Sequence, residues 1–245
     1  MKQTKKERRQ LRESFRHMSP RDKVDYIFTY YKLPIFTACV VLALLISSVW
    51  RALTKKDPVL YVAYINVTAG ETLDSALTDG YLQYMELDPK KQEMIVYRNL
   101  YITEDASVED HQFVYASKMK LIGSIYASRL DVVLMDEDAY NQMSQSGFLY
   151  AFSDITDKSP EVLEALTPYI TENDIIIEDN AVEYNLNEAE EYSAVTERRK
   201  NAIKVSGFPI FQKAGMSGEV YAGIIANTKR PRQSLSYLHY LLTAE

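Results

Sequence analysis

Candidate chemistry in this sequence lies where polar side chains follow apolar runs. Asn66, Glu104 and Asp136 each come at or just after such a run. The runs predict buried strands, and ligands bind beyond the carboxyl ends of parallel strands in open α/β sheets. Amides, carboxylates and tyrosine rings at such an edge suit a polyol, a sugar or a cationic solute. The candidate ligand-binding residues are Asn66, Glu104, Asp136, Tyr140 and Asn227.

The same residues also have a purely structural interpretation. Asp136 can cap the helix that follows it, because an aspartate oxygen accepts hydrogen bonds from the free N–H groups of a first helical turn. Tyr64, Tyr101 and Tyr140 can be ordinary packing residues, since the chain after residue 50 contains 16 tyrosines. The sequence leaves both interpretations open.

Other chemistries find little support in the sequence. Glu104, Asp105 and the acidic residues 136–138 lack the spacing and the central glycine of an EF-hand calcium loop. After residue 50 the chain has two histidines and no cysteine, which is a poor ligand set for zinc. It also has no G-x-S-x-G motif and no glycine-rich phosphate loop. We therefore expect no enzymatic activity, no metal and no cofactor.

The elements that must position the candidate residues alternate in type. Short apolar runs rich in β-branched and aromatic residues predict strands, and longer segments with apolar residues at helical spacing predict helices. This alternation predicts a mainly parallel sheet with helices on both faces, a three-layer α/β domain. Strands are expected at residues 59–66, 93–102 and 130–137, and helices at 71–86, 107–129 and 138–147.

Two of these helices carry sequence signals at their ends. Ser107 is a plausible N-cap with Asp110 three residues later, and Gly147 fits a C-terminal cap. In the helix at 107–129, the stripe expected to be buried consists of Val108, Tyr115, Met119, Ile122 and Tyr126.

The second half of the region is less regular. An apolar run lies within residues 174–179, and the charged residues 187–201 are expected to be solvated. The carboxyl-terminal residues 218–227 and 233–242 read as a strong strand and an amphipathic helix. A further strand is expected at 202–211 and a short helix at 160–166.

The overall acidity of the chain hides three different pieces. The formal net charge is −6, but residues 1–32 carry ten cations against four anions, a net of +6. Residues 33–50 carry no charge, and residues 51–245 carry a net of −12. The chain is therefore expected to divide into a basic segment at 1–32, a span at 33–50, a tether at 51–58 and an α/β domain at 59–245.

The uncharged piece is long enough to cross a membrane. Its 18 residues would extend about 27 Å as a helix, close to the hydrocarbon thickness of about 30 Å. The excess of cations before it predicts a cytoplasmic N-terminus and an extracytoplasmic C-terminal region, with the lipid bilayer as a partner. The span is represented by Leu33, Pro34, Val41, Leu45 and Trp50.

The basic segment is expected to form two short amphipathic helices, one around residues 11–18 and one that starts at residue 19. Ser19-Pro20 reads as a helix start, and Pro34 is expected to break or kink the chain. Such a segment suits the anionic inner leaflet or a membrane or transporter partner. No nucleic-acid-binding motif accompanies its charge, so no nucleic acid is expected as a partner. Its apolar stripe consists of Val24, Ile27, Phe28 and Tyr31.

Two segments resemble extracellular solute-binding proteins of the periplasmic type. Residues 130–155 show a strand ending in Asp, a short helix and a turn of the kind seen in that family, and residues 218–242 show a strand, an Asn-Thr pair, a basic turn and a helix ending in Tyr-Leu-Leu. The YYK motif before a span also resembles single-span proteins of Gram-positive bacteria. The resemblance implies a reduced binding-protein lobe that binds a solute.

Two functions follow from these patterns. The first is a single-pass membrane protein that presents a solute-binding-like domain outside the cell, with an apolar-walled cleft for a small neutral or cationic solute. The second is a structural or interaction module of the cell envelope that kept the fold and lost the ligand. An open cleft favours the first function, and a cleft filled by side chains favours the second.

Overall fold

A computed structural model describes residues 19–103, 111–186, 191–216 and 218–244. The chain forms two compact units, Met1–Lys55 and Lys56–Glu245. We describe each unit by itself.

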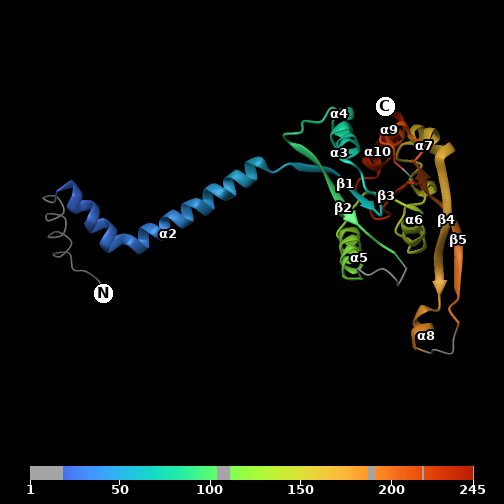
Figure 1. The fold of residues 1–245 in the computed structure, drawn as a ribbon, viewed down its shortest axis with the longest axis horizontal. Coiled ribbons are helices and arrows are strands. Elements are labelled where there is room, and N and C mark those ends of the chain that lie inside the picture. Colours follow the sequence, from blue (N-terminus) through green and yellow to red (C-terminus); the bar gives the residue numbers. More distant parts are fainter. Residues whose placement is uncertain (1–18, 104–110, 187–190, 217, 245) are drawn as a thin grey trace. The chain divides into compact units, whose positions relative to one another are not determined.

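The described part of the first unit forms one long helix, α2 (Pro20–Thr54). The helix begins at Pro20, as the Ser19-Pro20 pair predicts, and it continues through Pro34, so of the two expected outcomes, a break or a kink, the break does not occur. A helix can absorb an interior proline by bending, and Figure 1 shows α2 with a bend between two arms. The helix expected around residues 11–18 lies outside the described residues, and the apolar stripe of the basic segment lies outside the described side chains.

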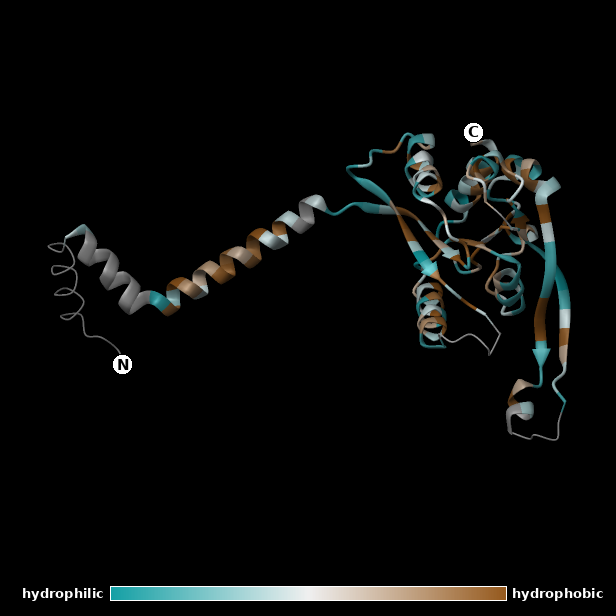
Figure 2. Cartoon of the chain, in the orientation of Figure 1, coloured by the Kyte–Doolittle hydropathy of each residue, from teal (hydrophilic) through white to brown (hydrophobic). Residues whose placement is uncertain are grey.

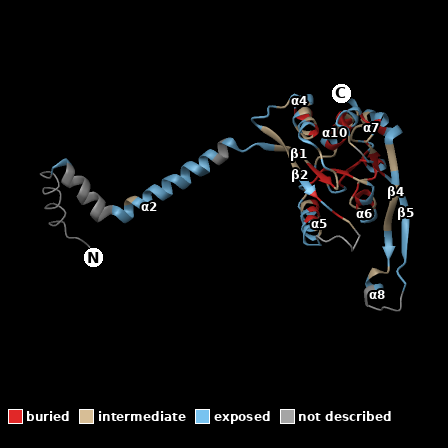
Figure 3. Ribbon diagram, in the orientation of Figure 1, coloured by how far each residue is buried: buried red, intermediate tan, exposed pale blue. Residues whose placement is uncertain are grey.

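Residues Lys32–Trp50 of α2 are long and apolar enough to cross a membrane. The segment is brown in the hydropathy colouring of Figure 2 and almost entirely exposed in Figure 3. Leu33, Val41, Leu45 and Trp50 are all exposed. A core helix of a soluble protein would be mostly buried, so these apolar side chains lack the cover that a water-soluble fold provides.

The second unit is built on a six-stranded mixed sheet in the order β2-β1-β3-β6-β5-β4. β1 pairs in parallel with both β2 and β3, and the pairs β3–β6, β6–β5 and β5–β4 are antiparallel. The strands are β1 (Asp57–Ile65), β2 (Gln92–Leu100), β3 (Val132–Met135), β4 (Ile170–Asp179), β5 (Ala194–Lys204) and β6 (Tyr221–Ile224).

The expectation of a mainly parallel sheet is therefore wrong for β6, β5 and β4, which pair in antiparallel fashion. The first three strands are joined by helical crossovers, which parallel pairing requires. The last three follow one another along the chain without such a crossover, so each runs back against its neighbour. The expected strand at 202–211 is also shifted, because β5 ends at Lys204 and α9 (Pro209–Lys213) follows.

Helices cover both faces of the sheet and make three layers. On one face, Leu60, Val62 and Tyr64 of β1 pack in a core with α3 (Glu71–Ser75), α4 (Tyr81–Tyr84), α7 (Pro160–Leu166) and α10 (Pro231–Thr243). On the other face, Ala63 and Ile65 pack in a second core with α5 (His111–Tyr126) and α6 (Glu137–Gln145). The alternation along β1 follows the two-residue period of a strand that is buried on both faces.

Helix α5 buries a different face from the one expected. Ser117, Leu121 and Ile125 are buried, whereas Tyr115, Met119 and Tyr126 are exposed and Ile122 is half-buried. The aliphatic and small side chains pack against the sheet, and the larger tyrosine and methionine side chains face solvent. Ser107, Val108 and Asp110 lie outside the described residues.

The helix expected at 71–86 is present, but it contains a π-helical turn, η1 (Ala76–Gly80). Two tyrosines of α10 meet it there: the Tyr240 hydroxyl donates to the Ala76 carbonyl at 2.6 Å, and the Tyr237 hydroxyl donates to the Leu77 carbonyl at 3.1 Å. Outside groups that take up backbone carbonyls favour local widening of a helix.

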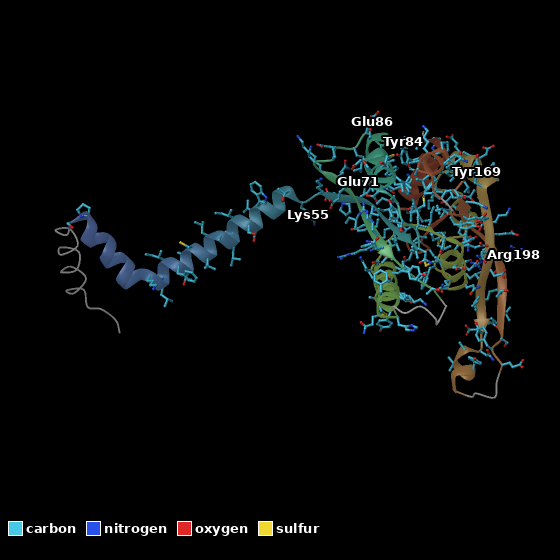
Figure 4. The ribbon with its side chains drawn as sticks, viewed as in Figure 1. Lys55, Glu71, Tyr84, Glu86, Tyr169 and Arg198 are labelled. Carbon is cyan, nitrogen blue, oxygen red and sulfur yellow. The ribbon has the colours of Figure 1, made fainter. Side chains whose placement is uncertain are left out.

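Strands β4 and β5 form a long hairpin that extends beyond the rest of the sheet (Figure 1). Only Ala202–Lys204 of β5 pairs with β6, so the outer part is a two-stranded ribbon with α8 (Ala181–Leu186) at its end. Arg198, labelled in Figure 4, lies 3.6 Å from Glu172 and 3.9 Å from Asp174 across the ribbon. The side chains of 194–200 are mostly exposed, as expected for residues 187–201, but Asn201 is buried.

Candidate functional site

A solvent-open cleft of about 950 Å³ lies at the carboxyl ends of β1 and β3. Asn66 follows β1 directly, Asp136 follows β3, and both line the cleft. The other walls come from the loop before α3, the first turns of α3 and α6, and residues 213–216 and 218–220 near the end of α9 and the start of β6. The parallel pairing of β1 with β3 brings the two candidate residues together, as the sequence predicts.

Asn66 is held by its own hydrogen bonds. Its amide oxygen accepts from the Ile102 backbone N–H at 2.9 Å, and its amide nitrogen donates to the Ile102 carbonyl at 2.8 Å. The same nitrogen donates to Asp136 Oδ1 at 3.1 Å. The backbone of Asn66 is left-handed with φ of 57°, a conformation that asparagine tolerates better than most residues. Asn66 therefore shapes the cleft wall by tying β1 to the end of β2.

Asp136 is the N-cap of α6. Its Oδ1 accepts from the Ala139 backbone N–H at 2.9 Å, besides the bond from Asn66. The structural interpretation of Asp136 is thus supported, and the same carboxylate lines the cleft. Gly147 ends α6 with φ of 68°, which confirms the C-terminal cap predicted there.

Tyr140 lies away from the cleft, buried between α6 and β5. Its hydroxyl donates to Asn201 Oδ1 at 2.9 Å, and its ring stacks on Tyr221 with centroids 4.8 Å apart. Asn201 in turn donates to Ser144 at 2.7 Å. Burial raises the pKa of Tyr140, so the hydroxyl stays protonated as a donor. This network holds the hairpin against α6.

Asn227 lies near the amino end of β3, whereas the cleft lies at the carboxyl end. The expectation that it joins the site is wrong because β6 is antiparallel to β3, with Val132 opposite Ile224 and Met135 opposite Tyr221. Its amide donates to the Ile125 carbonyl at 2.7 Å, at the end of α5. Glu104 lies outside the described residues.

The antiparallel direction of β6 brings other residues to the cleft instead. Glu219, just before β6, lines it together with Lys213, and Glu71 comes from the start of α3 (labelled in Figure 4). Glu137 and Asp138 come from the first turn of α6. Glu71, Lys213 and Glu219 escaped prediction, since their place depends on strand direction and helix packing rather than on a local motif.

The cleft is acidic, and one of its carboxylates is firmly ionised. Hydrogen bonds from Lys204 and Tyr221 lower the pKa of Glu219. The Tyr221 hydroxyl donates to Glu219 Oε2 at 2.6 Å, and burial together with this carboxylate raises the pKa of Tyr221. Five carboxylates and one lysine line the cleft together with five apolar side chains, so its wall is mixed and not the apolar wall that was expected.

Within the described parts of the chain, no group of three histidine, cysteine or acidic side chains is placed to hold a metal ion. The cleft instead offers separate carboxylates around an open space, an arrangement that can hydrogen-bond and neutralise an organic cation.

A second polar cluster, at the opposite edge of the sheet, is structural. Asp131 is fully buried and accepts from the Tyr61 backbone N–H at 2.9 Å and from the Thr228 hydroxyl at 2.5 Å. Arg230 lies 3.5 Å from Asp131 and over the Tyr61 ring. These contacts join β1, β3 and the turn before α10, and they supply the buried carboxylate with hydrogen-bond donors.

Comparison with known proteins found no relative: no family model, no curated protein and no solved structure matches the chain.

Proposed function

We propose that this chain is a single-pass membrane protein whose α/β domain lies outside the cell and binds a small organic cation or a neutral polyhydroxylated solute. The observation that carries the proposal is the open cleft of about 950 Å³, large enough for a small ligand, at the carboxyl ends of β1 and β3. We prefer a cation because the cleft has five carboxylates against one lysine.

The charge of the whole domain supports this choice. Residues 51–245 carry a net charge of −12, which attracts cations and repels anions at long range. The first turn of α6 contains Glu137 and Asp138, which counter the positive end of the helix dipole where an anion would otherwise bind.

The membrane part of the proposal rests on α2. Its segment Lys32–Trp50 is apolar and exposed, and nine cations precede it. Positive residues are retained on the cytoplasmic side, so we infer that the N-terminus is inside and the α/β domain outside.

The solute-binding class is proposed from the two motifs at residues 130–155 and 218–242. Each holds a strand followed by a helix, β3 with α6 and β6 with α10. Asp136, which follows the first of these strands, lies in the cleft wall.

An interaction module of the cell envelope is the second candidate. It is favoured by large apolar side chains that stay exposed on the domain, among them Tyr115 and Tyr126 on α5 and Val182 on α8. Such side chains mark contact surfaces when they cluster.

The ligand proposal is tested on the full chain in detergent micelles by thermal unfolding. The probes are putrescine, spermidine, arginine, glycine betaine and a neutral disaccharide. A ligand at a hundred times its Kd stabilises by about 2.7 kcal/mol, which raises the Tm of a domain of this size by roughly 5–10 °C. We expect a cationic probe to produce a shift of this order.

A matched pair of variants locates the binding site. Glu71→Gln with Asp138→Asn removes two cleft carboxylates, and Glu161→Gln with Glu164→Gln removes two exposed carboxylates on α7. The first pair should lose the probe-induced shift and the second should keep it. The ligand proposal fails if no probe shifts the Tm, or if both pairs respond alike.

A further inference from the structure

Helix α5 carries an apolar stripe that nothing in the described structure covers. Tyr115, Met119 and Tyr126 are 67%, 50% and 75% exposed. Positions separated by four and by seven residues share one helical face, so the three side chains form a continuous row. At about 1.5 Å per residue, the row is roughly 16 Å long. We refer to these three residues as the α5 stripe.

The outer end of the β4–β5 hairpin carries a second exposed apolar cluster. Tyr184 and Tyr192 meet edge to face with ring centroids 5.9 Å apart, although both are nearly half exposed. More than half of each of the other members is also exposed. We refer to the whole cluster as the hairpin tip: Ile177, Val182, Tyr184, Tyr192 and Val195.

The two surfaces have opposite charge. The charged residues from His111 to Arg129 are Lys118, Lys120 and Arg129, with no acid among them. Between Ile177 and Val195 the charged residues with described side chains are Glu178, Asp179 and Glu191, with no base among them. Each surface therefore pairs exposed aromatic and aliphatic side chains with charges of one sign, and the signs are complementary.

Within one copy of the domain the two surfaces are far apart in the sheet. Helix α5 packs on β2, which is one edge strand, and the hairpin contains β4, which is the other. Figure 1 shows the end of the hairpin, with α8, well separated from α5. The two surfaces therefore belong to opposite edge strands of one copy.

We propose that the hairpin tip of one copy of this chain docks on the α5 stripe of a second copy. Tyr184 and Tyr192 pack against Tyr115, Met119 and Tyr126, and the acidic rim of the tip faces Lys120 and Arg129. The contact joins two different surfaces, so two copies either exchange hairpins reciprocally in a closed pair or continue into a chain in the plane of the membrane.

A lipid surface fits this pair of features less well. Tyrosine, methionine and lysine on α5 alone would suit a membrane interface. The hairpin tip is acidic, however, and an anionic leaflet repels it. A second copy satisfies both surfaces at once, whereas a bilayer satisfies one.

The proposal is tested by site-directed cross-linking of the full chain in its native membranes. Cys39 is the single cysteine of the chain and is replaced by serine. One tagged copy carries Tyr184→Cys, and a differently tagged copy carries Met119→Cys. In cells that make both copies, a short bis-maleimide should join the two tags at least fivefold more than in cells where both tags carry the same cysteine.

Two controls make the result specific. Lys90→Cys lies in an exposed loop before β2 and replaces Met119→Cys in a parallel mixture, where cross-linking should stay at background. Thermal unfolding of each variant should match the parent, because every substituted side chain is at least partly exposed. Mixed cross-linking no higher than with Lys90→Cys overturns the proposal.

A charge exchange then tests the orientation of the contact. Lys120→Glu in the Met119→Cys copy should lower mixed cross-linking at least threefold, and Glu178→Lys in the Tyr184→Cys copy should restore it. A loss that Glu178→Lys does not repair contradicts the proposed pairing. Protection of Met119→Cys by lipid, in cells that make this copy alone, assigns the α5 stripe to the bilayer and also overturns the proposal.

Discussion

At the scale of single residues, Asn66 both holds the neighbouring backbone and lines the cleft. Its side chain satisfies both the N–H and the carbonyl of Ile102, and its backbone is left-handed. Ile102 is only 3% exposed, so losing the amide leaves buried backbone groups without partners.

We predict that Asn66→Ala destabilises the chain more than Asn66→Gly. Both variants lose the side-chain bonds, at a cost of roughly 2–4 kcal/mol. Alanine destabilises the fold by a further ~1–2 kcal/mol, because its Cβ disfavours the left-handed backbone that glycine adopts freely. Thermal unfolding in detergent measures the order. Equal or reversed melting temperatures would show that the left-handed backbone at Asn66 is not important.

Glu219 gives the domain a pH dependence with a definite sign. Its folded-state pKa is lowered by Lys204 and Tyr221, so the ionised carboxylate stabilises the fold above the ordinary pKa of glutamate, about 4.3. That contribution is lost as the pH falls through the lowered folded-state value.

We therefore expect Glu219→Gln to melt slightly below the parent at pH 7, because the side chain is solvent-exposed and screened. The two melting curves should converge in acid, below the lowered pKa of Glu219. A difference that stays constant from pH 7 to pH 3 would mean that the effect does not come from the ionised pair.

At the scale of elements, the π-helical turn depends on the close approach of α10. A methyl group added at Gly80 would collide with the Tyr240 hydroxyl, the group that donates to the Ala76 carbonyl. We predict that Gly80→Ala costs about 1–3 kcal/mol through overpacking. The loss should show as a lower Tm of the full chain.

The matched variant for this position is Gly80→Ala combined with Tyr240→Phe, which removes the colliding oxygen. The double variant should be less destabilised than the sum of the two single variants by at least about 0.5 kcal/mol. Simple additivity would contradict the steric explanation.

Helix α5 offers a second test at this scale, because its buried face was predicted wrongly. Leu121→Ala should lower stability by about 2–4 kcal/mol, since Leu121 packs in the core below the sheet. Met119→Ala should change it by less than about 0.5 kcal/mol, since the side chain is half exposed. A larger loss from Met119→Ala than from Leu121→Ala would restore the expected face.

These elements also show which structural features can be predicted from the sequence and which cannot. The strands around Val62, Val96 and Val133 are predictable because apolar, β-branched runs suit strands buried in a sheet. The cap at Asp136 is predictable because capping is local. The place of Asn227 is not predictable, because the direction of β6 is decided by its pairing with β3 and β5. The face of α5 is ambiguous in the sequence, since tyrosine and methionine are found both in cores and on surfaces.

At the scale of the whole molecule, the chain divides by charge. A basic amino-terminal segment, an uncharged exposed helix and an acidic α/β domain follow one another. The proposal joins them into one function: the basic segment sets the orientation, the span anchors the chain, and the acidic domain concentrates cations near its cleft.

Labelling of one cysteine in intact cells tests this account most directly. Thr68 is exposed and lines the cleft, so Thr68→Cys in a Cys39→Ser chain reports both the side of the membrane and the occupancy of the cleft. Lys90→Cys, away from the cleft, is the matched control. The reagent is a membrane-impermeant maleimide, with and without spermidine.

The account predicts that Thr68→Cys is labelled in intact cells, and that spermidine slows this labelling while leaving Lys90→Cys unchanged. The slowing should disappear when Glu71→Gln and Asp138→Asn are added. Labelling of Thr68→Cys only after the cells are lysed would contradict the external location, and labelling in intact cells that spermidine never slows would contradict cation binding in the cleft.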